Sequence, residues 1–236
     1  AAGYHLRAKP LCDGRVKMQN FELKAVEFED DGYGHEQFLA GNYDAGEFSL
    51  ANYCALKSRG EPYMAIPVFP NRKFRHSYIF VRDDSSLTEP AQLKGKRVGI
   101  PGWLNTCGLW ARGILSDEYG VKTRDIHWIS RRKTPLDVAL PAGTEFDVVP
   151  GEGSLAARLL KGEFDAIIVP DFPEGKGWRR LLADSKAVEQ DYYRRTGIFP
   201  TSHAIIFHKA YLDNYPAAAQ EMFTACCEAK TLALRV

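Results

Sequence analysis

The sequence predicts an α/β protein of two lobes with a ligand cleft between them. The chain has 236 residues, of which 45% are hydrophobic and 26% charged, and this is enough for two small cores. Strand-like and helix-like runs alternate along it, as they do in α/β proteins. A short sequence pattern also occurs twice, in Phe38–Ala45 and Leu159–Ala166, which share the order apolar, x, x, Gly, x, aromatic, Asp, Ala. Each copy predicts a helix that stops at glycine and leads into a strand, so two similarly built lobes are expected.

The individual elements follow from hydrophobic periodicity. Residues 21–28 alternate apolar and polar side chains, which is the period of a half-buried strand. The helix at 216–232 opens with proline, which a first helical turn tolerates. Polar runs near 82–86 and 196–201 are the segments where the chain is expected to pass from one lobe to the other. One lobe is therefore expected to contain residues 1–82 plus 200–236, and the other residues 83–199. The remaining expected strands are 63–68, 77–81, 97–100, 126–129, 164–169 and 204–207, and the remaining helices are 33–40, 50–58, 106–119, 154–160 and 177–182.

Charge and cysteine content restrict the function. Lys and Arg total 31 against 30 for Asp and Glu, so no global field favours nucleic acid or a membrane surface as a partner. No run approaches the ~20 apolar residues of a membrane helix, and no export signal is readable. The five cysteines are odd in number and form no C-x-x-C pair, which fits free thiols in a reducing cytoplasm. These features predict a soluble cytoplasmic protein with a small-molecule partner, and they leave open whether it forms a homo-oligomer.

The first polar cluster, Gly46–Ser49, falls where a strand stops and a helix begins. Ser49 suits the cap of the following helix and is also a candidate ligand contact. Glu47 has no such structural task, so it is either a solvated carboxylate or a catalytic base.

The second cluster, Phe69–Ser77, is a basic connector between two apolar strands. Arg72 and Arg75 can each hold a carboxylate in a two-point contact, and His76 can deliver a proton near neutral pH. Ser77 adjoins them as a further candidate ligand contact. The alternatives are a solvated charge run and a structural histidine in a turn.

Two more clusters flank predicted strands. Asn105 or Thr106 caps the helix after a Pro-Gly turn, whose free backbone N–H groups favour an anion, and Arg112 follows on that helix. His203 lies just before the strand at 204–207 and is a second candidate base. The sequence shows no zinc-ligand spacing, no phosphate-binding loop and no serine-hydrolase elbow, so no metal or other cofactor is expected.

Several longer runs resemble the 4,5-dihydroxyphthalate decarboxylase family. The resemblance covers nearly the whole chain, and Ile66–Ser77 and Thr196–Pro200 are its most specific parts. It implies a type II periplasmic-binding-protein-like fold, a cytoplasmic location and the conversion of 4,5-dihydroxyphthalate to protocatechuate and carbon dioxide. The runs that carry it are Gly46–Ser49, Ala65–Ser77, Leu93–Pro101, Trp110–Leu115 and Tyr192–Pro200.

The chemistry of such a reaction assigns roles to the candidate residues. An ionised hydroxyl para to a carboxylate-bearing carbon makes that carbon basic, so the reaction needs only a base, an acid and cations. Glu47 or His203 is the expected base and His76 the expected acid. Arg72, Arg75 and Arg112 are the expected carboxylate clamps. The alternative is a non-catalytic solute-binding protein for an aromatic or sulfonated organic acid, since the same fold serves that function.

Overall fold

The computed structural model describes residues 7–26, 28, 31–133 and 136–235, which divide into two compact units. Unit 1 takes the chain up to Arg72 and again from Thr201, and unit 2 takes Lys73–Pro200. The first crossing therefore lies about ten residues earlier than the expected boundary after residue 82. The reason is that strand β3 (Ile79–Arg82) pairs with two strands of unit 2.

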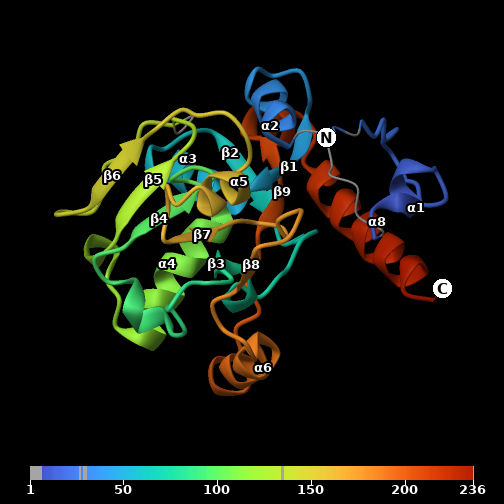
Figure 1. Cartoon of the computed structure of the whole chain (residues 1–236). Coiled ribbons are helices and arrows are strands. Elements are labelled where there is room, and N and C mark those ends of the chain that lie inside the picture. Colours follow the sequence, from blue (N-terminus) through green and yellow to red (C-terminus); the bar gives the residue numbers. More distant parts are fainter. Residues whose placement is uncertain (1–6, 27, 29–30, 134–135, 236) are drawn as a thin grey trace. The chain divides into compact units, whose positions relative to one another are not determined.

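Unit 1 contains a three-stranded sheet in the order β1 (Ala45–Ser49), β9 (His203–His208), β2 (Tyr63–Ile66). The central strand β9 runs antiparallel to both neighbours. Ile66, Ile205 and Phe207 of the sheet pack with apolar side chains of the last helix, α8. Figure 1 shows α8 alongside α1, and the two helices are in contact. The helices of this unit are α1 (Lys9–Cys12), α2 (Asp31–Leu39), α3 (Leu50–Ser58), α7 (Lys209–Asn214) and α8 (Ala217–Ala233).

Unit 2 contains a six-stranded sheet in the order β6-β5-β4-β7-β3-β8 (Figure 1). The strands β4 to β7 are parallel, and β3 is antiparallel to both β7 and β8. Apart from β3, its strands are β4 (Arg97–Ile100), β5 (His127–Ser130), β6 (Glu145–Val148), β7 (Ala166–Ile168) and β8 (Trp178–Arg180). Its helices are α4 (Thr106–Tyr119), α5 (Leu155–Leu160) and α6 (Ser185–Thr196), with short 3₁₀ turns at His76–Tyr78, Pro90–Leu93 and Thr123–Asp125.

Side-chain alternation along β7 explains how this sheet is covered on both faces. Ala166 and Ile168 belong to a buried cluster with α4, whereas Ile167, between them, belongs to a cluster with α5. A strand buried on both faces is typical of parallel sheets in α/β proteins. The α/β prediction is confirmed.

Both copies of the repeated sequence pattern have the predicted local structure, a helix that stops near glycine and leads into a strand. Gly41 and Gly162 have φ values of 82° and 77° directly after α2 and α5, in the left-handed region that glycine adopts without strain. Each is followed by a strand that begins at the alanine of the pattern, Ala45 and Ala166.

Two predicted elements are wrong. Residues 21–26 and 28 form no strand. Phe21 and Leu23 instead pack against the apolar cluster that contains Ala218 and Met222 of α8. The predicted helix at 177–182 is instead strand β8, which pairs with β3 and places the Trp178 ring 5.2 Å from that of Phe80.

Candidate functional site

A buried carboxylate and an imidazole are brought together by the pairing of β1 with β9 in unit 1. Ser49 lies opposite His203 and Glu47 opposite Ile205, so these four side chains project from one face of the sheet. Glu47 is thereby a diagonal neighbour of His203. Its Oε1 lies 2.6 Å from His203 Nδ1. The two candidate bases of the sequence therefore form one pair, which we call the Glu47–His203 pair.

The burial of this pair favours a strong interaction. The side chain of Glu47 is only 4% exposed and that of His203 is 15% exposed. Hydrogen bonds that involve an ionised group are shorter and stronger than neutral ones. When Nδ1 donates to the carboxylate, Nε2 is the nitrogen that can exchange a proton with a ligand, and the carboxylate stabilises the imidazolium that results. The pair can therefore act as a general base.

Other candidate residues of unit 1 lie in different settings. Ser49 caps α3, since its Oγ accepts a hydrogen bond from Asn52 N at 3.5 Å, as the cap prediction required. Leu50 N donates to Ser202 O at 2.9 Å and holds the start of α3 against the residue before His203. Arg72 is exposed, and its guanidinium lies 5.5 Å from the centre of the Phe69 ring.

Residues 75–77 and 105–106, which include five of the remaining candidates, lie at one edge of the unit 2 sheet. The chain runs from β4 to β5 in one direction and then returns to β7 on the other side of β4, so the strand order reverses between β4 and β7. In open α/β sheets, ligands bind at the carboxyl ends of the strands at such a reversal. The turn at His76–Tyr78 lies at the same edge because β3 is antiparallel to β7.

Arg75 is buried at this edge and contacts the segment that follows β7. It is 2% exposed, its Nη1 donates to Pro170 O at 3.4 Å, and its guanidinium lies 5.3 Å from the centre of the Tyr78 ring. Cys107 Sγ lies 3.2 Å from Val169 O of the same segment. Burial raises the pKa of the Cys107 thiol to about 11, although the nearby Arg75 cation opposes the shift, so the thiol is protonated at neutral pH.

Arg112 is held inside the main core of unit 2. Its Nη2 donates to Trp103 O at 2.8 Å, and its guanidinium lies 4.1 Å from the centre of the Trp103 ring and 5.7 Å from that of Trp128. Burial lowers the pKa of Arg112 to about 10, so it stays a cation at neutral pH. Its Nη1 is buried and has no hydrogen-bond partner in the described part of the chain.

Asn105, one of the two residues predicted to cap this helix, caps α4. Its Oδ1 accepts hydrogen bonds from Cys107 N at 3.1 Å and Gly108 N at 3.3 Å. Thr106 is 5% exposed at the first position of the helix. Two of the N–H groups expected to point at an anion are thus bonded to the cap.

His76 lies in a buried aromatic setting under α6. It is 1% exposed, and its ring centre lies 5.0 Å from that of Tyr192 and 6.5 Å from that of Tyr119. The adjacent Ser77 N donates to Glu189 Oε1 at 2.8 Å. Burial lowers the pKa of His76, and the carboxylates of Glu189 and Glu118 partly oppose this shift. This setting favours the structural interpretation of His76.

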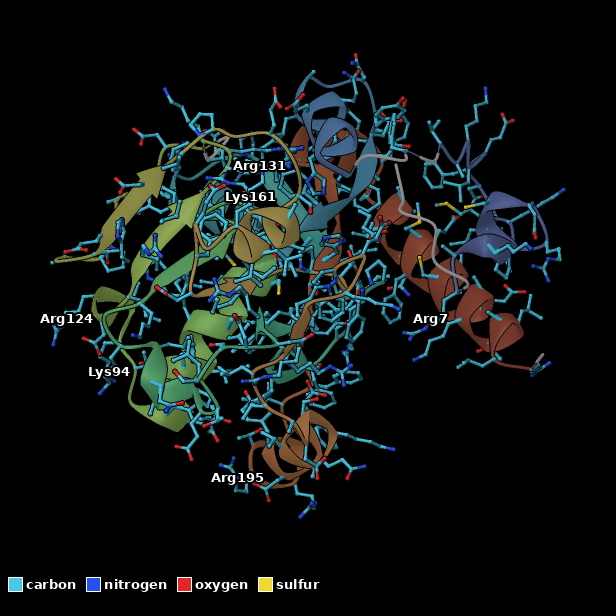
Figure 2. The ribbon with its side chains drawn as sticks, in the orientation of Figure 1. Arg7, Lys94, Arg124, Arg131, Lys161 and Arg195 are labelled. Atoms are coloured by element: carbon cyan, nitrogen blue, oxygen red, sulfur yellow. The ribbon has the colours of Figure 1, made fainter. Side chains whose placement is uncertain are left out.

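Sequence reasoning missed several residues that define these surroundings. Glu189 and Tyr192 come from α6, which was not predicted. Figure 2 shows Arg195 on the same helix, where it forms ion pairs with Glu118 of α4 and Asp191. Figure 2 also labels Arg131, the first of three consecutive cations after β5, whose Nη1 donates to Gly153 O at 2.8 Å. A cationic run directly after a buried strand was a readable signal.

Neither a metal centre nor a membrane span is found in the described residues. No group of three or more His, Cys, Asp or Glu side chains there is placed to hold a metal ion. No described helix is both long enough and apolar enough to cross a membrane.

Comparisons with known proteins agree with this architecture. Residues 30–176 match the family described as ABC transporter, phosphonate, periplasmic substrate-binding protein. The aliphatic sulphonate binding protein SsuA of Escherichia coli superposes with a TM-score of 0.61 at 20% identity, over 99% of this chain and 73% of that one. The alkanesulfonate-binding protein SsuA of Xanthomonas axonopodis gives a TM-score of 0.58 at 17% identity, over 99% and 73%. The fold is therefore that of the periplasmic binding proteins.

Two curated relatives define the family more narrowly. The 4,5-dihydroxyphthalate decarboxylase of Comamonas testosteroni is 32% identical over 246 residues, which cover 99% of this chain and 74% of the relative. The enzyme of the same name from Pseudomonas putida is 32% identical over 206 residues, which cover 82% and 80%. The chain belongs to the 4,5-dihydroxyphthalate decarboxylase family, as the sequence motifs indicated.

Proposed function

We propose that this protein is a cofactor-independent carboxy-lyase that removes one carboxylate from a dihydroxylated aromatic dicarboxylate. The proposed substrate is 4,5-dihydroxyphthalate, and the products are protocatechuate and carbon dioxide. The Glu47–His203 pair carries the proposal, because a buried carboxylate that holds an imidazole by Nδ1 is suited to proton transfer. The relatives named as decarboxylases supply the substrate class.

The substrate itself supplies most of the driving force in this mechanism. Each hydroxyl of 4,5-dihydroxyphthalate is para to a carbon that bears a carboxylate. His203 Nε2 removes the hydroxyl proton, and Glu47 stabilises the resulting imidazolium. The electron density moves to the para carbon, which takes a proton. The bond from that carbon to the carboxylate then breaks, its electron pair restores the aromatic phenolate, and carbon dioxide leaves. The imidazolium of His203 then returns its proton to the phenolate oxygen, which regenerates the base.

The proton donor to the ring carbon needs a separate assignment. His76 was expected in this role, but its ring is packed between Tyr119 and Tyr192 with 1% exposure of the residue. A general acid has to come within hydrogen-bond reach of the atom it protonates, directly or through one water. We therefore assign this proton to water and give His76 a structural role.

Cations within each unit are proposed as carboxylate contacts. In unit 1 the exposed Arg72 is the proposed clamp. In unit 2 the proposed anion-binding element is the carboxyl edge of the sheet. There Arg75 and Arg112 contribute fixed positive charge, and the α4 N-terminus adds its dipole. Asn105 caps α4 at this edge, and Asn105, Ser77 and Thr106 are proposed as its remaining ligand contacts.

A non-catalytic solute-binding protein is the second candidate function. The match to the phosphonate-binding family and the superposition on sulfonate-binding proteins favour it. These findings describe a fold that serves both functions. The Glu47–His203 pair favours the enzyme, since a pure binder needs no proton-transfer group.

The proposed location is the cytoplasm. All five cysteines are free thiols, which fits a reducing cytoplasm. A small-molecule acid is the proposed partner, and a homo-oligomer is the assembly to test by light scattering.

An optical assay separates the two candidate functions. Purified protein is mixed with 4,5-dihydroxyphthalate, and the ultraviolet spectrum is followed while the products are separated by chromatography. The enzyme converts the spectrum to that of protocatechuate with many turnovers. A binding protein would leave the substrate unchanged at one equivalent per site, and that result would reject the proposal.

A further inference from the structure

His35 lies beside the Glu47–His203 pair, although it comes from a different part of the chain. It belongs to α2, which packs against β1. The ring centres of His35 and His203 are 5.8 Å apart, and the two rings are nearly perpendicular, at 82°. Aromatic rings favour this edge-to-face arrangement at such separations.

A second contact holds His35 in place. Its ring centre lies 4.6 Å from that of Phe48, which is 1% exposed and neighbours Glu47 on β1. Phe48 in turn lies 5.8 Å from Phe38, another side chain of α2 with 1% exposure. The ring of His35 therefore packs against a buried part of unit 1.

We infer that His35 is a positioning residue that fixes the imidazole of His203. The inference rests on the proposed function, in which His203 is the base. Glu47 anchors one atom of the imidazole, Nδ1, and packing against the ring restricts the small rocking motion that one hydrogen bond allows. The perpendicular ring of His35 limits this motion, so that Nε2 keeps one direction. A base must be held close to its productive geometry, because small misplacements reduce the rate.

Two substitutions separate positioning from proton chemistry. His35→Ala removes the ring contact, whereas His35→Phe keeps an aromatic ring that cannot exchange a proton. We expect kcat to fall about tenfold in His35→Ala, which corresponds to the upper range for one aromatic contact, while KM changes little. His35→Phe should restore kcat to within about threefold of the parent, since the ring contact is retained. His127→Ala, on β5 of unit 2, is the matched control for loss of a histidine.

A spectroscopic measurement tests the inference independently of turnover. Nitrogen-15 imidazole spectra, assigned with a His203→Gln variant, report whether His203 carries its proton on Nδ1. The parent and His35→Phe should show one ordered state with Nδ1 protonated, and His35→Ala should show averaging between states. If the parent has no decarboxylase activity, the proposed function fails while this measurement still tests the ring contact. The inference is overturned if His35→Ala leaves both kcat and the His203 signals unchanged, or if His35→Phe is as slow as His35→Ala.

Discussion

Replacement of Glu47 by glutamine tests the pair at its buried end. Glu47→Gln keeps the size of the side chain and removes the negative charge that lies 2.6 Å from His203 Nδ1. A hydrogen bond to a charged group contributes about 1.5–3 kcal/mol. The Glu47 side chain is 4% exposed, so little water can take the place of the lost bond. If the hydrogen bond to the Glu47 carboxylate stabilises the imidazolium of His203 during proton transfer, its loss lowers kcat by roughly 10- to 100-fold.

The assay for Glu47→Gln is initial-rate decarboxylation together with thermal unfolding. Glu36→Gln, an exposed position on α2, loses the same charge outside the pair and serves as the control. We expect the rate to fall in Glu47→Gln alone, with analogue affinity nearly unchanged. A rate within about threefold of the parent in a folded variant would refute the assigned role of Glu47, because it lies below the smallest expected loss.

Four further predictions concern the residues of unit 2 and the metal requirement of turnover. His76→Asn should destabilise the fold by about 1–3 kcal/mol and leave turnover within a few-fold, whereas a fall of roughly 10²–10⁴-fold without loss of stability would restore the proton-donor interpretation. The pKa of His76 is lower in the folded protein than its ordinary value of 6.5 in the unfolded chain. As pH falls below 6.5, the unfolded chain therefore binds more protons than the folded protein, and the free energy of unfolding of the parent decreases. Urea unfolding at pH 7.5 and 5.5 should show a smaller drop in His76→Asn, and equal drops would contradict a buried neutral imidazole. Arg112→Met should cost about 1–3 kcal/mol, because Trp103 O loses its donor, and an unchanged melting temperature would argue against that contact. Chelators should leave the turnover rate intact, and a loss restored by zinc or manganese would show that a metal takes part.

Local chemistry made several elements predictable from the sequence. The helices α3 and α4 match their expected bounds because Ser49 and Asn105 are strong caps at their starts. Gly120 then ends α4 in the left-handed conformation. These signals lie within a few residues of the structure that they determine.

The elements that depend on distant contacts were not predictable. The polar helix α6 was missed because only Ser185 and Tyr192 are buried along it, which leaves almost no hydrophobic period. Strand β8 was taken for a helix because its pairing with β3 joins segments about a hundred residues apart.

The candidate site shows the same division. Glu47 and His203 were each candidate bases, but their contact depends on the register of β1 against β9, 156 residues apart in the chain. His35 was not among the candidate residues, since its neighbours in sequence give no sign of His203. The burial of Arg75, His76 and Arg112 likewise follows from packing in unit 2.

The most direct test of the account compares the parent with His203→Gln on 4,5-dihydroxyphthalate, and measures carbon dioxide release and the affinity for a phthalate analogue in parallel. The account predicts that the parent releases one carbon dioxide per protocatechuate formed. His203→Gln should lose roughly 10²–10⁴-fold in rate and keep its affinity for the analogue. Carbon dioxide release at the parental rate in folded His203→Gln, or none from the parent while it binds the substrate intact, would contradict the claim that the Glu47–His203 pair carries out a decarboxylation.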